Sequence, residues 1–551
     1  MNPAAALSQV LVDELVRGGV TDAVLSPGSR SAPLAVALAA EGRIRLHVRI
    51  DERSAGFLAV GLAMVSSRPV PVLCTSGTAA ANLHPAVLEA AHAHLPLVVL
   101  TADRPSELRG TGANQATDQL KLYGDAVEFF AEVGAPEERP GMVAYWRSLM
   151  SRALAASARG PVHLNVAFRA PLSGAGDGDW IEPLAGRSPQ GPWTVIARPA
   201  APAPPAMVDA PERGVVVVGH GAVTGAPAAA RRLAEQLAWP LLSEPTGNAR
   251  AGPNAIATYP LLLADDHFAA RHAPALVLTI GKPNLSRSLL RFLTTAERHV
   301  VIDPHPDWAD PTRSAHEVWP AVPAGDGAAR PPTGWLGGWL AADSSARRAV
   351  DSSLDAKPVS EPRLARDLMA ALPAGALLLA GSSRPARDLE AYTPAREGVQ
   401  VVGNRGLSGI DGLVSTAVGA ALAHGGPSYA LLGDLSLLHD ANGLILGPGQ
   451  PRPDLTLIVV DNNGGGIFST LEPASEPAFE QIFGTPPDVD LRALAAATRT
   501  PFQELTDLAE LPAALSGSGI RLLVVRTRRD ETAQLHRRLQ AAVSGALAVG
   551  P

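Results

Sequence analysis

Two short motifs in the last third of the chain place oxygen ligands directly after apolar runs. In "LLGDLSLLHDANGL" Asp434 follows such a run, and 28 residues later "LTLIVVDNNGGGIF" ends the next run with Asn462, Asn463 and three glycines. A carboxylate, an amide oxygen and the carbonyl of Gly464 are hard ligands that suit Mg²⁺, which usually completes its shell with phosphate oxygens and water. Glycines let the backbone approach such a ligand closely. We therefore expect Mg²⁺, with Mn²⁺ as the alternative, and a phosphate-bearing ligand here.

A second candidate group is the carboxylate of Glu52 in "RIRLHVRIDERSAGFLAVGLAMVSS". Apolar and polar residues alternate over 43–50, which predicts a strand, and the small and apolar residues after Arg53 predict a buried helix. Burying a carboxylate is costly unless it is paired or functional. From the residues alone, Glu52 is either a catalytic group or the partner of Arg49 or Arg53 in a surface ion pair.

The elements that must position these groups are short β-branched runs that alternate with Ala- and Leu-rich runs. The expected strands fall within 22–27, 69–76, 95–105, 214–221, 275–283, 299–306, 375–383, 428–436 and 455–463. This alternation is typical of parallel sheets with helices on both faces, and ligands bind beyond the carboxyl ends of such strands. Two Pro-, Gly- and Ala-rich stretches, roughly 171–213 and 320–360, divide the chain. We predict an α/β fold of three domains, each a mainly parallel sheet flanked by helices, at 1–180, 195–345 and 358–551.

Composition excludes several classes of protein. The chain has 551 residues and a net charge of −7, which permits about three domains and leaves no basic footprint for nucleic acid. Its single cysteine excludes an internal disulfide and a cysteine-rich zinc site. His47, His92 and His94 have no third ligand at a suitable spacing, so we expect no metal there. The first residues lack a basic region followed by an apolar core, so we expect no signal peptide. The sequence also has no apolar run of about 18 residues, so we expect a soluble, cytoplasmic protein without integral membrane contact.

The spacing of Asp434 and Asn462 resembles the fingerprint of thiamine-diphosphate-dependent enzymes, although Leu435 stands where that fingerprint usually has Gly. The resemblance implies that thiamine diphosphate is the cofactor and that Asp434, Asn462 and Gly464 bind Mg²⁺. It also implies a thiamine-diphosphate-binding fold with a pyrimidine-binding domain (1–180), a central Rossmann-like domain (195–345) and a diphosphate- and Mg²⁺-binding domain (358–551).

The same resemblance assigns roles to four further residues. Glu52 matches the glutamate that hydrogen-bonds the pyrimidine N1′ and promotes loss of the thiazolium C2 proton. Ile410 matches the bulky apolar residue that bends the cofactor, and Ser383 is expected to contact it. Phe468 matches an active-site aromatic residue, and a role in the core is an equal alternative.

Six longer motifs resemble one family of these enzymes, the 2-succinyl-5-enolpyruvyl-6-hydroxy-3-cyclohexene-1-carboxylate synthases of menaquinone biosynthesis. They lie at 25–34, 51–63, 75–87, 100–115, 404–423 and 462–472. The implied transferase (carboligase) reaction decarboxylates 2-oxoglutarate and adds the remaining unit to isochorismate in a conjugate (1,4) manner. Arginine suits such substrates because its fork binds carboxylates bidentately.

By this resemblance the substrate-binding residues are Ser29, Arg30, Arg104, Asn114, Gln115, Arg287, Ser383, Arg387 and Arg405. Arg287 matches one member of a basic pair whose second position is Ser288 here. The family places the active site between subunits, which implies a homodimer or a homotetramer.

Two alternatives remain open from the sequence. Gly219, Gly221 and Gly225 follow an apolar run, and Glu244 ends the next one, which is near the dinucleotide-binding fingerprint. One alternative is therefore an acetolactate-synthase-type enzyme with flavin in its central domain, or a nicotinamide oxidoreductase. The other is a non-catalytic homologue, against which the intact Glu52, Asp434 and Asn462 argue.

Overall fold

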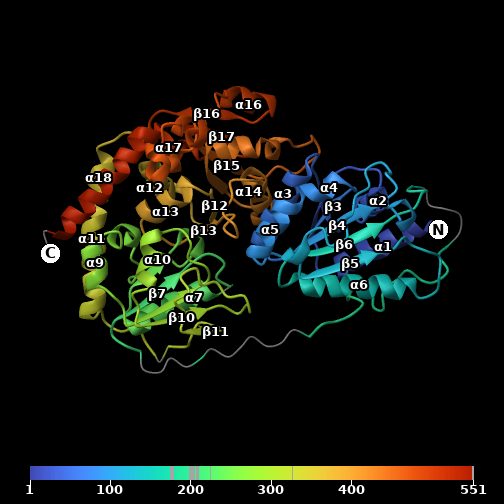
Figure 1. Cartoon of the computed structure of the whole chain (residues 1–551), viewed down its shortest axis with the longest axis horizontal. Helices are drawn as coiled ribbons and strands as arrows, with labels where there is room; N and C mark the ends of the chain where they lie inside the picture. Colours follow the sequence, from blue (N-terminus) through green and yellow to red (C-terminus); the bar gives the residue numbers. More distant parts are fainter. Residues whose placement is uncertain (174–178, 198–204, 206–209, 224, 326, 549–551) are drawn as a thin grey trace. The chain divides into compact units, whose positions relative to one another are not determined.

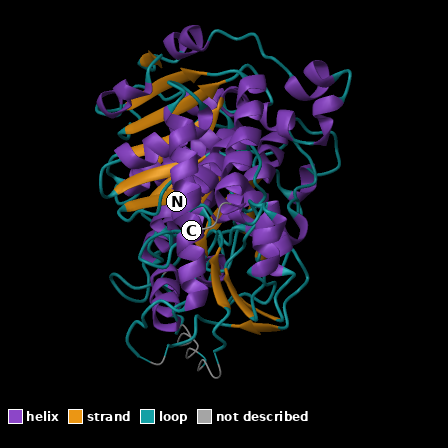
Figure 2. Ribbon diagram, turned by 90° about the vertical axis from the view of Figure 1, so that its left-hand side faces the viewer, coloured by secondary structure: helices purple, strands orange, loops and turns teal. Residues whose placement is uncertain are grey.

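The structure, a computed structural model, describes residues 1–173, 179–197, 205, 210–223, 225–325 and 327–548. It contains three sheets, with strand orders β2-β1-β3-β4-β6-β5, β11-β10-β9-β7-β8 and β13-β12-β14-β15-β17-β16. Helices surround the strands of each sheet (Figure 2). All nine runs expected as strands form strands, and the α/β class with three sheets flanked by helices is confirmed.

The first sheet is parallel throughout. Its strands are β1 (Asp22–Leu25), β2 (Arg45–Val48), β3 (Val70–Cys74), β4 (Leu97–Asp103), β5 (Phe129–Val133) and β6 (Val162–Ala167). Its helices are α1 (Pro3–Arg17), α2 (Ala32–Ala40), α3 (Glu52–Ser66), α4 (Thr78–Asn82), α5 (His84–His92) and α6 (Met142–Ser157). Figure 1 shows α1 and α6 on one face of this sheet and α3 and α5 on the other.

The second sheet is also parallel and lies in the middle of the sequence. Its strands are β7 (Gly214–Val218), β8 (Leu241–Ser243), β9 (Leu276–Ile280), β10 (Arg298–Ile302) and β11 (Glu317–Trp319). Its helices are α7 (Ala226–Leu237), α8 (Tyr259–Leu262), α9 (Asp266–Arg271), α10 (Arg287–Leu293) and α11 (Gly334–Asp355). The central strands β7 and β9 are almost wholly apolar and buried, as expected for a parallel sheet covered on both faces, whereas the edge strand β11 is mostly exposed.

The third sheet carries the Asp434 and Asn462 motifs. Its strands are β12 (Ala376–Ala380), β13 (Val399–Val402), β14 (Ser428–Gly433), β15 (Leu455–Asp461), β16 (Phe502–Leu505) and β17 (Ile520–Arg526). The helices of this part are α12 (Glu361–Ala371), α13 (Arg384–Tyr392), α14 (Leu413–His424), α15 (Asp434–His439), α16 (Leu491–Ala497), α17 (Leu511–Ala514) and α18 (Arg529–Ala548). Because β14 and β15 are neighbours, both motifs start from the same part of the sheet.

Contacts between residues divide the chain into two compact units. Unit 1 comprises Met1–Pro199, Asn404–Gly425 and Ser436–Leu455, and unit 2 comprises Ala200–Gly403, Gly426–Leu435 and Thr456–Pro551. The site residues expected from the sequence fall into two groups, one in each unit. Each sheet lies within one of the three expected domain ranges, whose boundaries stay a prediction.

Two expectations need correction. Most of the stretch 320–360, expected as a linker, is the 22-residue helix α11, which is held in place by the buried side chains of Trp339 and Ala346. The first stretch, 171–213, lies partly outside the described residues. In β2 the apolar alternation does not mark the buried face, because His47 is buried while Ile50, just beyond the strand, is 70% exposed. His47 is buried because its Nε2 hydrogen-bonds Asp22 of the neighbouring strand at 2.8 Å.

Candidate active site

In unit 2, Asp434 stands at the carboxyl end of β14 with its side chain almost fully buried. Its Oδ2 accepts a hydrogen bond from the Gly464 amide at 2.8 Å, and its Oδ1 accepts one from the Leu435 amide at 2.7 Å. Burial raises the pKa of Asp434 to about 6, and these two hydrogen bonds oppose the rise. The motif residues Asp434 and Gly464 are therefore in contact, as their strand ends led us to expect.

Asn462 is oriented by a residue that the sequence did not reveal. Its Nδ2 donates to Oε1 of Glu361 at 3.0 Å, and the hydroxyls of Thr527 and Thr532 donate to the same oxygen at 2.9 and 3.2 Å. Glu361 thereby fixes the orientation of the Asn462 side-chain amide, with Nδ2 towards Glu361. The opposite atom, Oδ1, is buried and accepts no hydrogen bond from any described residue.

A buried oxygen without a donor is a costly arrangement that a bound cation relieves. Here the oxygen without a donor is Oδ1 of Asn462. The turn that follows Asn462 is tied to the carboxylate of Asp434 through the Gly464 amide. One carboxylate, one amide oxygen and one backbone carbonyl form the type of oxygen ligand set that Mg²⁺ takes together with phosphate and water. The residues present therefore fit a divalent cation with a phosphate-bearing cofactor.

The three glycines after Asn463 are required by close packing. Gly464 has a φ of +130°, and a Cβ there would lie 1.9 Å from the carbonyl oxygen of Gly484. A Cβ on Gly466 would lie 2.6 Å from Nδ2 of Asn462. The turn is thus held against both Asn462 and the segment around Gly484, which keeps the Gly464 carbonyl in a fixed place.

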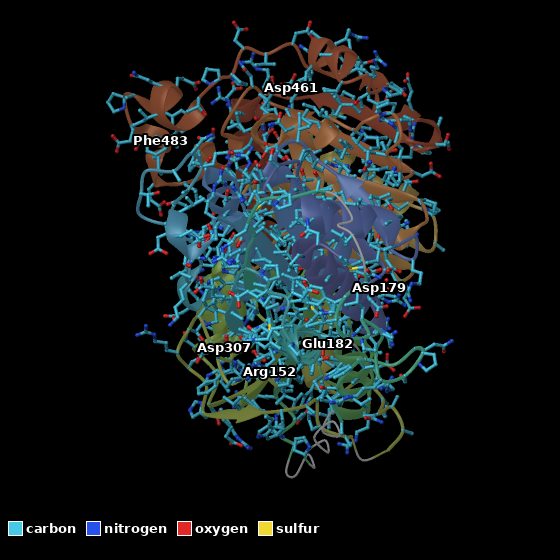
Figure 3. All side chains as sticks on the ribbon, turned by 90° about the vertical axis from the view of Figure 1, so that its right-hand side faces the viewer. Arg152, Asp179, Glu182, Asp307, Asp461 and Phe483 are labelled. Carbon is cyan, nitrogen blue, oxygen red and sulfur yellow. The ribbon has the colours of Figure 1, made fainter. Side chains whose placement is uncertain are left out.

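Phe468 and Asp461 frame this turn. Phe468 lies in the 3-10 helix Gly466–Thr470, is half-buried, and packs on Phe483 with the ring centroids 5.5 Å apart. Figure 3 labels Phe483 and also Asp461 at the end of β15. A cavity of about 640 Å³ is lined by Asn462, Asn463 and a group of residues that includes Arg528, Arg529 and Arg537. The packing on Phe483 accounts for Phe468 as a structural residue and leaves its expected active-site role untested.

Three expected substrate contacts also lie in unit 2. Ser383 and Arg387 are together, since Nη1 of Arg387 donates to the Ser383 carbonyl at 3.0 Å. Ser383 precedes α13 with a φ of +75°, a region that non-glycine residues rarely adopt and that often marks functional sites. Arg287 is exposed and pairs with Glu472 at 3.1 Å, while the hydroxyl of Ser288 donates to the Pro260 carbonyl at 2.9 Å.

In unit 1, Glu52 is the first residue of α3. The helix starts there because the side chain of Asp51 accepts hydrogen bonds from the amides of Arg53 and Ser54 at 2.8 and 3.4 Å. Glu52 is half-buried, and the structure shows no salt bridge to Arg49 or Arg53. The surface ion pair that the sequence left open is therefore wrong.

Arg30 and Arg104 converge at the carboxyl ends of β1 and β4. Nη1 of Arg30 donates to the Phe168 carbonyl at 2.8 Å, its Nε is buried without an acceptor among the described residues, and Nη1 of Arg104 donates to the Ser76 hydroxyl. Burial lowers the pKa of Arg30, and the nearby positive charge of Arg104 lowers it further. Two guanidinium groups this close, with an unused buried donor, suit an anionic ligand.

The remaining expected contacts of the first sheet differ in exposure. Ser29 is exposed in the loop after β1, and Asn114 and Gln115 are exposed in the segment after β4. Gln115 has a φ of +50° and its backbone lies against Gly77, so this segment reaches the loop that also holds Ser76. The structure thus brings Gln115 to the edge where Arg104 lies.

Arg405 and Ile410 lie in a loop that is fastened to α5. The amides of Gly406 and Leu407 donate to the two carboxylate oxygens of Glu89 at 2.7 and 2.8 Å. Arg405 is almost fully buried and Ile410 is half-buried. Glu89 is a second residue that the sequence did not reveal, and it fixes the loop that carries both expected site residues.

Two residues of the dinucleotide-like pattern in the central sheet are engaged within the protein. A Cβ on Gly219 would lie 2.3 Å from the backbone of Lys282, so this glycine serves packing between strand ends. Glu244, expected to bind a ribose in that alternative, is fully buried, and its Oε1 accepts the amides of Asn284 and Leu285 at 2.7 and 2.8 Å. The acidic group is thus engaged with the protein backbone.

Within the described residues, no helix combines the length and the apolar character needed to cross a bilayer. Two family models match the chain: "Thiamine pyrophosphate enzyme, N-terminal TPP binding domain" at residues 5–122, and "Middle domain of thiamine pyrophosphate" at residues 191–379. Thiamine pyrophosphate is another name for thiamine diphosphate.

Curated proteins with the name 2-succinyl-5-enolpyruvyl-6-hydroxy-3-cyclohexene-1-carboxylate synthase align with the whole chain. The protein of Thermobifida fusca is 55% identical over 99% of this chain and 100% of its own length. Those of Saccharopolyspora erythraea and Kineococcus radiotolerans are 48% and 46% identical, over 99% and 100% of this chain and the full length of each relative. The chain therefore belongs to the 2-succinyl-5-enolpyruvyl-6-hydroxy-3-cyclohexene-1-carboxylate synthase family of thiamine-diphosphate-dependent enzymes.

Proposed function

We propose that the chain decarboxylates 2-oxoglutarate and adds the resulting four-carbon unit to isochorismate, giving 2-succinyl-5-enolpyruvyl-6-hydroxy-3-cyclohexene-1-carboxylate for menaquinone synthesis. The observation that carries this proposal is the full-length similarity to synthases of that name, at 55% identity over 99% of the chain. The same name on the other full-length relatives supports it over a flavin enzyme of the acetolactate-synthase type.

When bound, thiamine diphosphate supplies the electron sink for decarboxylation of a 2-oxo acid. Asp434, Asn462 and the Gly464 carbonyl would hold Mg²⁺, and the buried, unpaired Oδ1 of Asn462 supports this assignment. Glu52 would hold a proton at its carboxyl group and share it with the cofactor's pyrimidine ring. Its position at the start of α3, without a salt bridge to its neighbours, leaves the carboxylate available for this role.

The arginines would bind and orient the carboxylates of the two substrates. Arg30 and Arg104 lie together in unit 1, and Nε of Arg30 is buried without a partner among the described residues. In unit 2, Arg387 lies against the strained backbone of Ser383. A guanidinium binds a carboxylate bidentately, so each of these groups suits one end of a dicarboxylate.

The same proposal includes the expected organisation of the enzyme. A pyrimidine-binding domain (1–180), a central domain (195–345) and a diphosphate-binding domain (358–551) would assemble into a homodimer or homotetramer with active sites between subunits. We also propose that the enzyme acts in the cytoplasm, where a soluble biosynthetic enzyme of this family would find its substrates.

The proposal is tested by measuring CO₂ release from 2-oxoglutarate by the purified protein with thiamine diphosphate and Mg²⁺, with and without isochorismate. Release that isochorismate stimulates, together with an adduct of the expected mass, supports both substrates. Turnover of pyruvate without turnover of 2-oxoglutarate would retain the thiamine chemistry and contradict the substrates. A yellow protein with bound flavin would favour the acetolactate-type alternative.

A further inference from the structure

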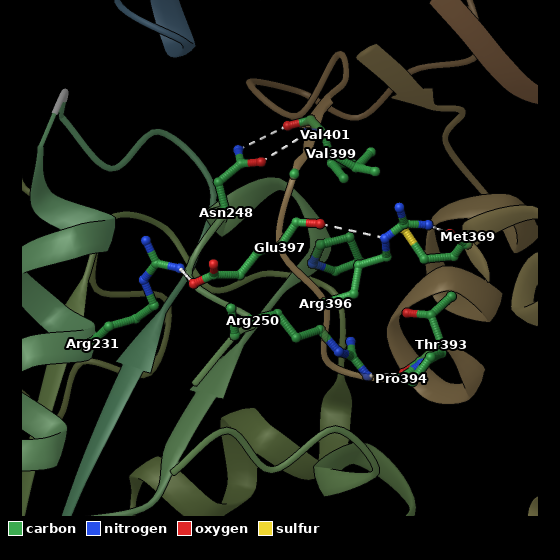
Figure 4. A pocket seen from close by; sticks show the side chains of 13 residues that line it. Arg231, Asn248, Arg250, Met369, Thr393, Pro394, Arg396, Glu397, Val399 and Val401 are labelled. Carbon is green, nitrogen blue, oxygen red and sulfur yellow. Dashed lines mark hydrogen bonds and ion pairs between the residues drawn. The ribbon is translucent and has the colours of Figure 1, made fainter. Parts of the chain in front are cut away.

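A basic pocket lies in unit 2, apart from the residues proposed for catalysis. Its cavity measures about 250 Å³. Its walls come from α7, from the segment after β8 and from the Thr393–Val401 segment between α13 and β13; Figure 4 shows their side chains. The polar and charged side chains in the lining are those of Arg231, Asn248, Arg250, Thr393, Arg396 and Glu397.

Arg250 is the buried cation of this pocket, with only 9% of its surface exposed. Its Nη2 donates to the carbonyls of Ala257 and Thr393, the latter at 2.9 Å. Its Nε and Nη1 are buried, and neither has an acceptor among the described residues. Figure 4 shows its side chain extending toward Thr393 and Pro394. Burying two donors of a charged group without partners is unfavourable, so a ligand that supplies acceptors would stabilise this arrangement.

The charge of the lining is unbalanced in favour of cations. It contains three guanidinium groups and a single carboxylate, that of Glu397. Glu397 pairs with Arg231 at 2.7 Å, and Arg231 keeps part of its side chain exposed. Arg396 donates to the carbonyls of Met369, Ala370 and Leu372 at the end of α12, so these neutral groups position its charge without cancelling it. The lining thus holds more cationic than anionic side chains, while the carboxylates of Glu390 and Asp343, which lie near Arg250 outside the lining, oppose part of its charge.

We propose that this pocket binds a small oxyanion, a carboxylate or phosphate group on a molecule that fits a cavity of about 250 Å³. Guanidinium groups recognise both anions through paired N–H donors, and the unpaired Nε and Nη1 of Arg250 supply such donors. The inference stands on the contacts of the pocket and does not depend on the proposed reaction.

The pocket's position in the chain gives a bound anion a structural consequence. The Thr393–Val401 segment connects α13, which carries Arg387, to β13, which is followed by Arg405. Asn248 is already fastened to this segment by hydrogen bonds with the Val401 amide and carbonyl at 2.8 and 2.9 Å. An anion held by Arg250 would fix the opposite end of the same segment, next to Thr393.

The test is calorimetric titration of the holoenzyme, loaded with thiamine diphosphate and Mg²⁺, with inorganic phosphate and separately with succinate. Arg231→Gln removes one cation and should raise the dissociation constant roughly tenfold. Glu397→Gln removes the competing carboxylate and should lower the dissociation constant roughly three- to tenfold, about the net effect of one ordinary hydrogen bond on an equilibrium. Tighter binding by Glu397→Gln cannot arise from damage to the fold.

The matched controls are Arg213→Gln and Glu297→Gln. These residues form a comparable pair at 2.6 Å, with both side chains exposed, and neither lines the pocket. The controls should leave both dissociation constants unchanged, although they alter the net charge equally. A response of the pocket variants to phosphate alone identifies a phosphate site, and a response to succinate alone identifies a carboxylate site. The proposal is overturned if neither anion binds saturably, or if Glu397→Gln and Glu297→Gln behave alike with both.

Discussion

Replacing Glu361 with alanine should weaken the proposed Mg²⁺ site without removing any of its ligands. Glu361 accepts hydrogen bonds from Asn462, Thr527 and Thr532, and the first of these directs Oδ1 of Asn462 away from Glu361. Without the carboxylate, the amide of Asn462 can rotate and present its NH₂ group to the cation. Glu361→Gln keeps an acceptor at the same place and should therefore preserve much of the orientation.

The expected magnitude follows from one hydrogen bond between a buried carboxylate and the 3.0 Å Nδ2 donor. Such a bond contributes roughly 1.5–3 kcal/mol, and each 1.4 kcal/mol corresponds to about a factor of ten in affinity. Glu361→Ala should raise the Mg²⁺ concentration for half-maximal activity roughly 10- to 100-fold, which agrees with the usual effect of residues that orient metal ligands. For Glu361→Gln we expect less than about a fivefold increase, because only the charge is lost.

The assay is a Mg²⁺ titration of activity at saturating thiamine diphosphate, with a parallel titration of cofactor binding by intrinsic fluorescence. Glu510→Gln, a change of an exposed carboxylate in the same part of the chain, serves as the control. Activity of Glu361→Ala should recover at high Mg²⁺, which separates a metal defect from loss of folding. A Mg²⁺ curve for Glu361→Ala that overlays the wild-type curve would refute the orienting role of Glu361.

Three further predictions concern the arginines, the helix packing and the first sheet. Arg104→Lys should raise the KM for 2-oxoglutarate roughly tenfold or more, because lysine cannot bind a carboxylate through two parallel N–H donors. The control Arg152→Lys, at an exposed position, should leave the KM unchanged. Equal KM values for the two variants would contradict the substrate contact of Arg104. Gly61→Ala should lower the midpoint of thermal unfolding by several degrees, because the new Cβ would lie 2.1 Å from the Thr416 carbonyl oxygen. The control Gly545→Ala should be neutral or stabilising, because no atom lies within 4 Å of its new Cβ. Burial alone would raise the pKa of Asp22, but hydrogen bonds from His47 and Arg45 outweigh burial and lower the pKa to about 2. The ionised Asp22 therefore stabilises the folded state above about pH 4, and this stabilisation is lost as the pH falls towards 2. Urea unfolding at pH 5 and pH 3 should show a loss of unfolding free energy roughly 0.5–1 kcal/mol larger for the wild type than for Asp22→Asn, after allowance for solvent screening. Equal losses would show that the pair is not the source.

The sequence predicted what depends on neighbouring residues. Asp434 and Asn462 each follow an apolar strand, so the sheet edge that they share was evident once a parallel sheet was expected. Glu52 was identifiable for the same reason, as a carboxylate at the junction of an expected strand and a buried helix. In these cases local order along the chain was enough.

Contacts between distant segments were not predictable in this way. Glu361 lies 101 residues from Asn462, and no pattern near Ser360 and Pro362 marks it as more than a helix start. Arg30 meets the Phe168 carbonyl across 138 residues. The prediction of a linker over 320–360 was wrong because it gave more weight to the glycines and prolines than to the helical pattern of tryptophans and alanines. That pattern forms a helix because Trp339 packs into the core.

The most direct test of the central claim is a comparison of Glu52→Gln with the wild type in two measurements, thiamine diphosphate binding and turnover of 2-oxoglutarate with isochorismate. If Glu52 shares its proton with the cofactor's ring, the glutamine variant should bind the cofactor within about threefold of the wild type and lose roughly 100-fold or more of its turnover, the usual contribution of a positioned acid–base group. A Glu52→Gln enzyme with full activity would contradict the account.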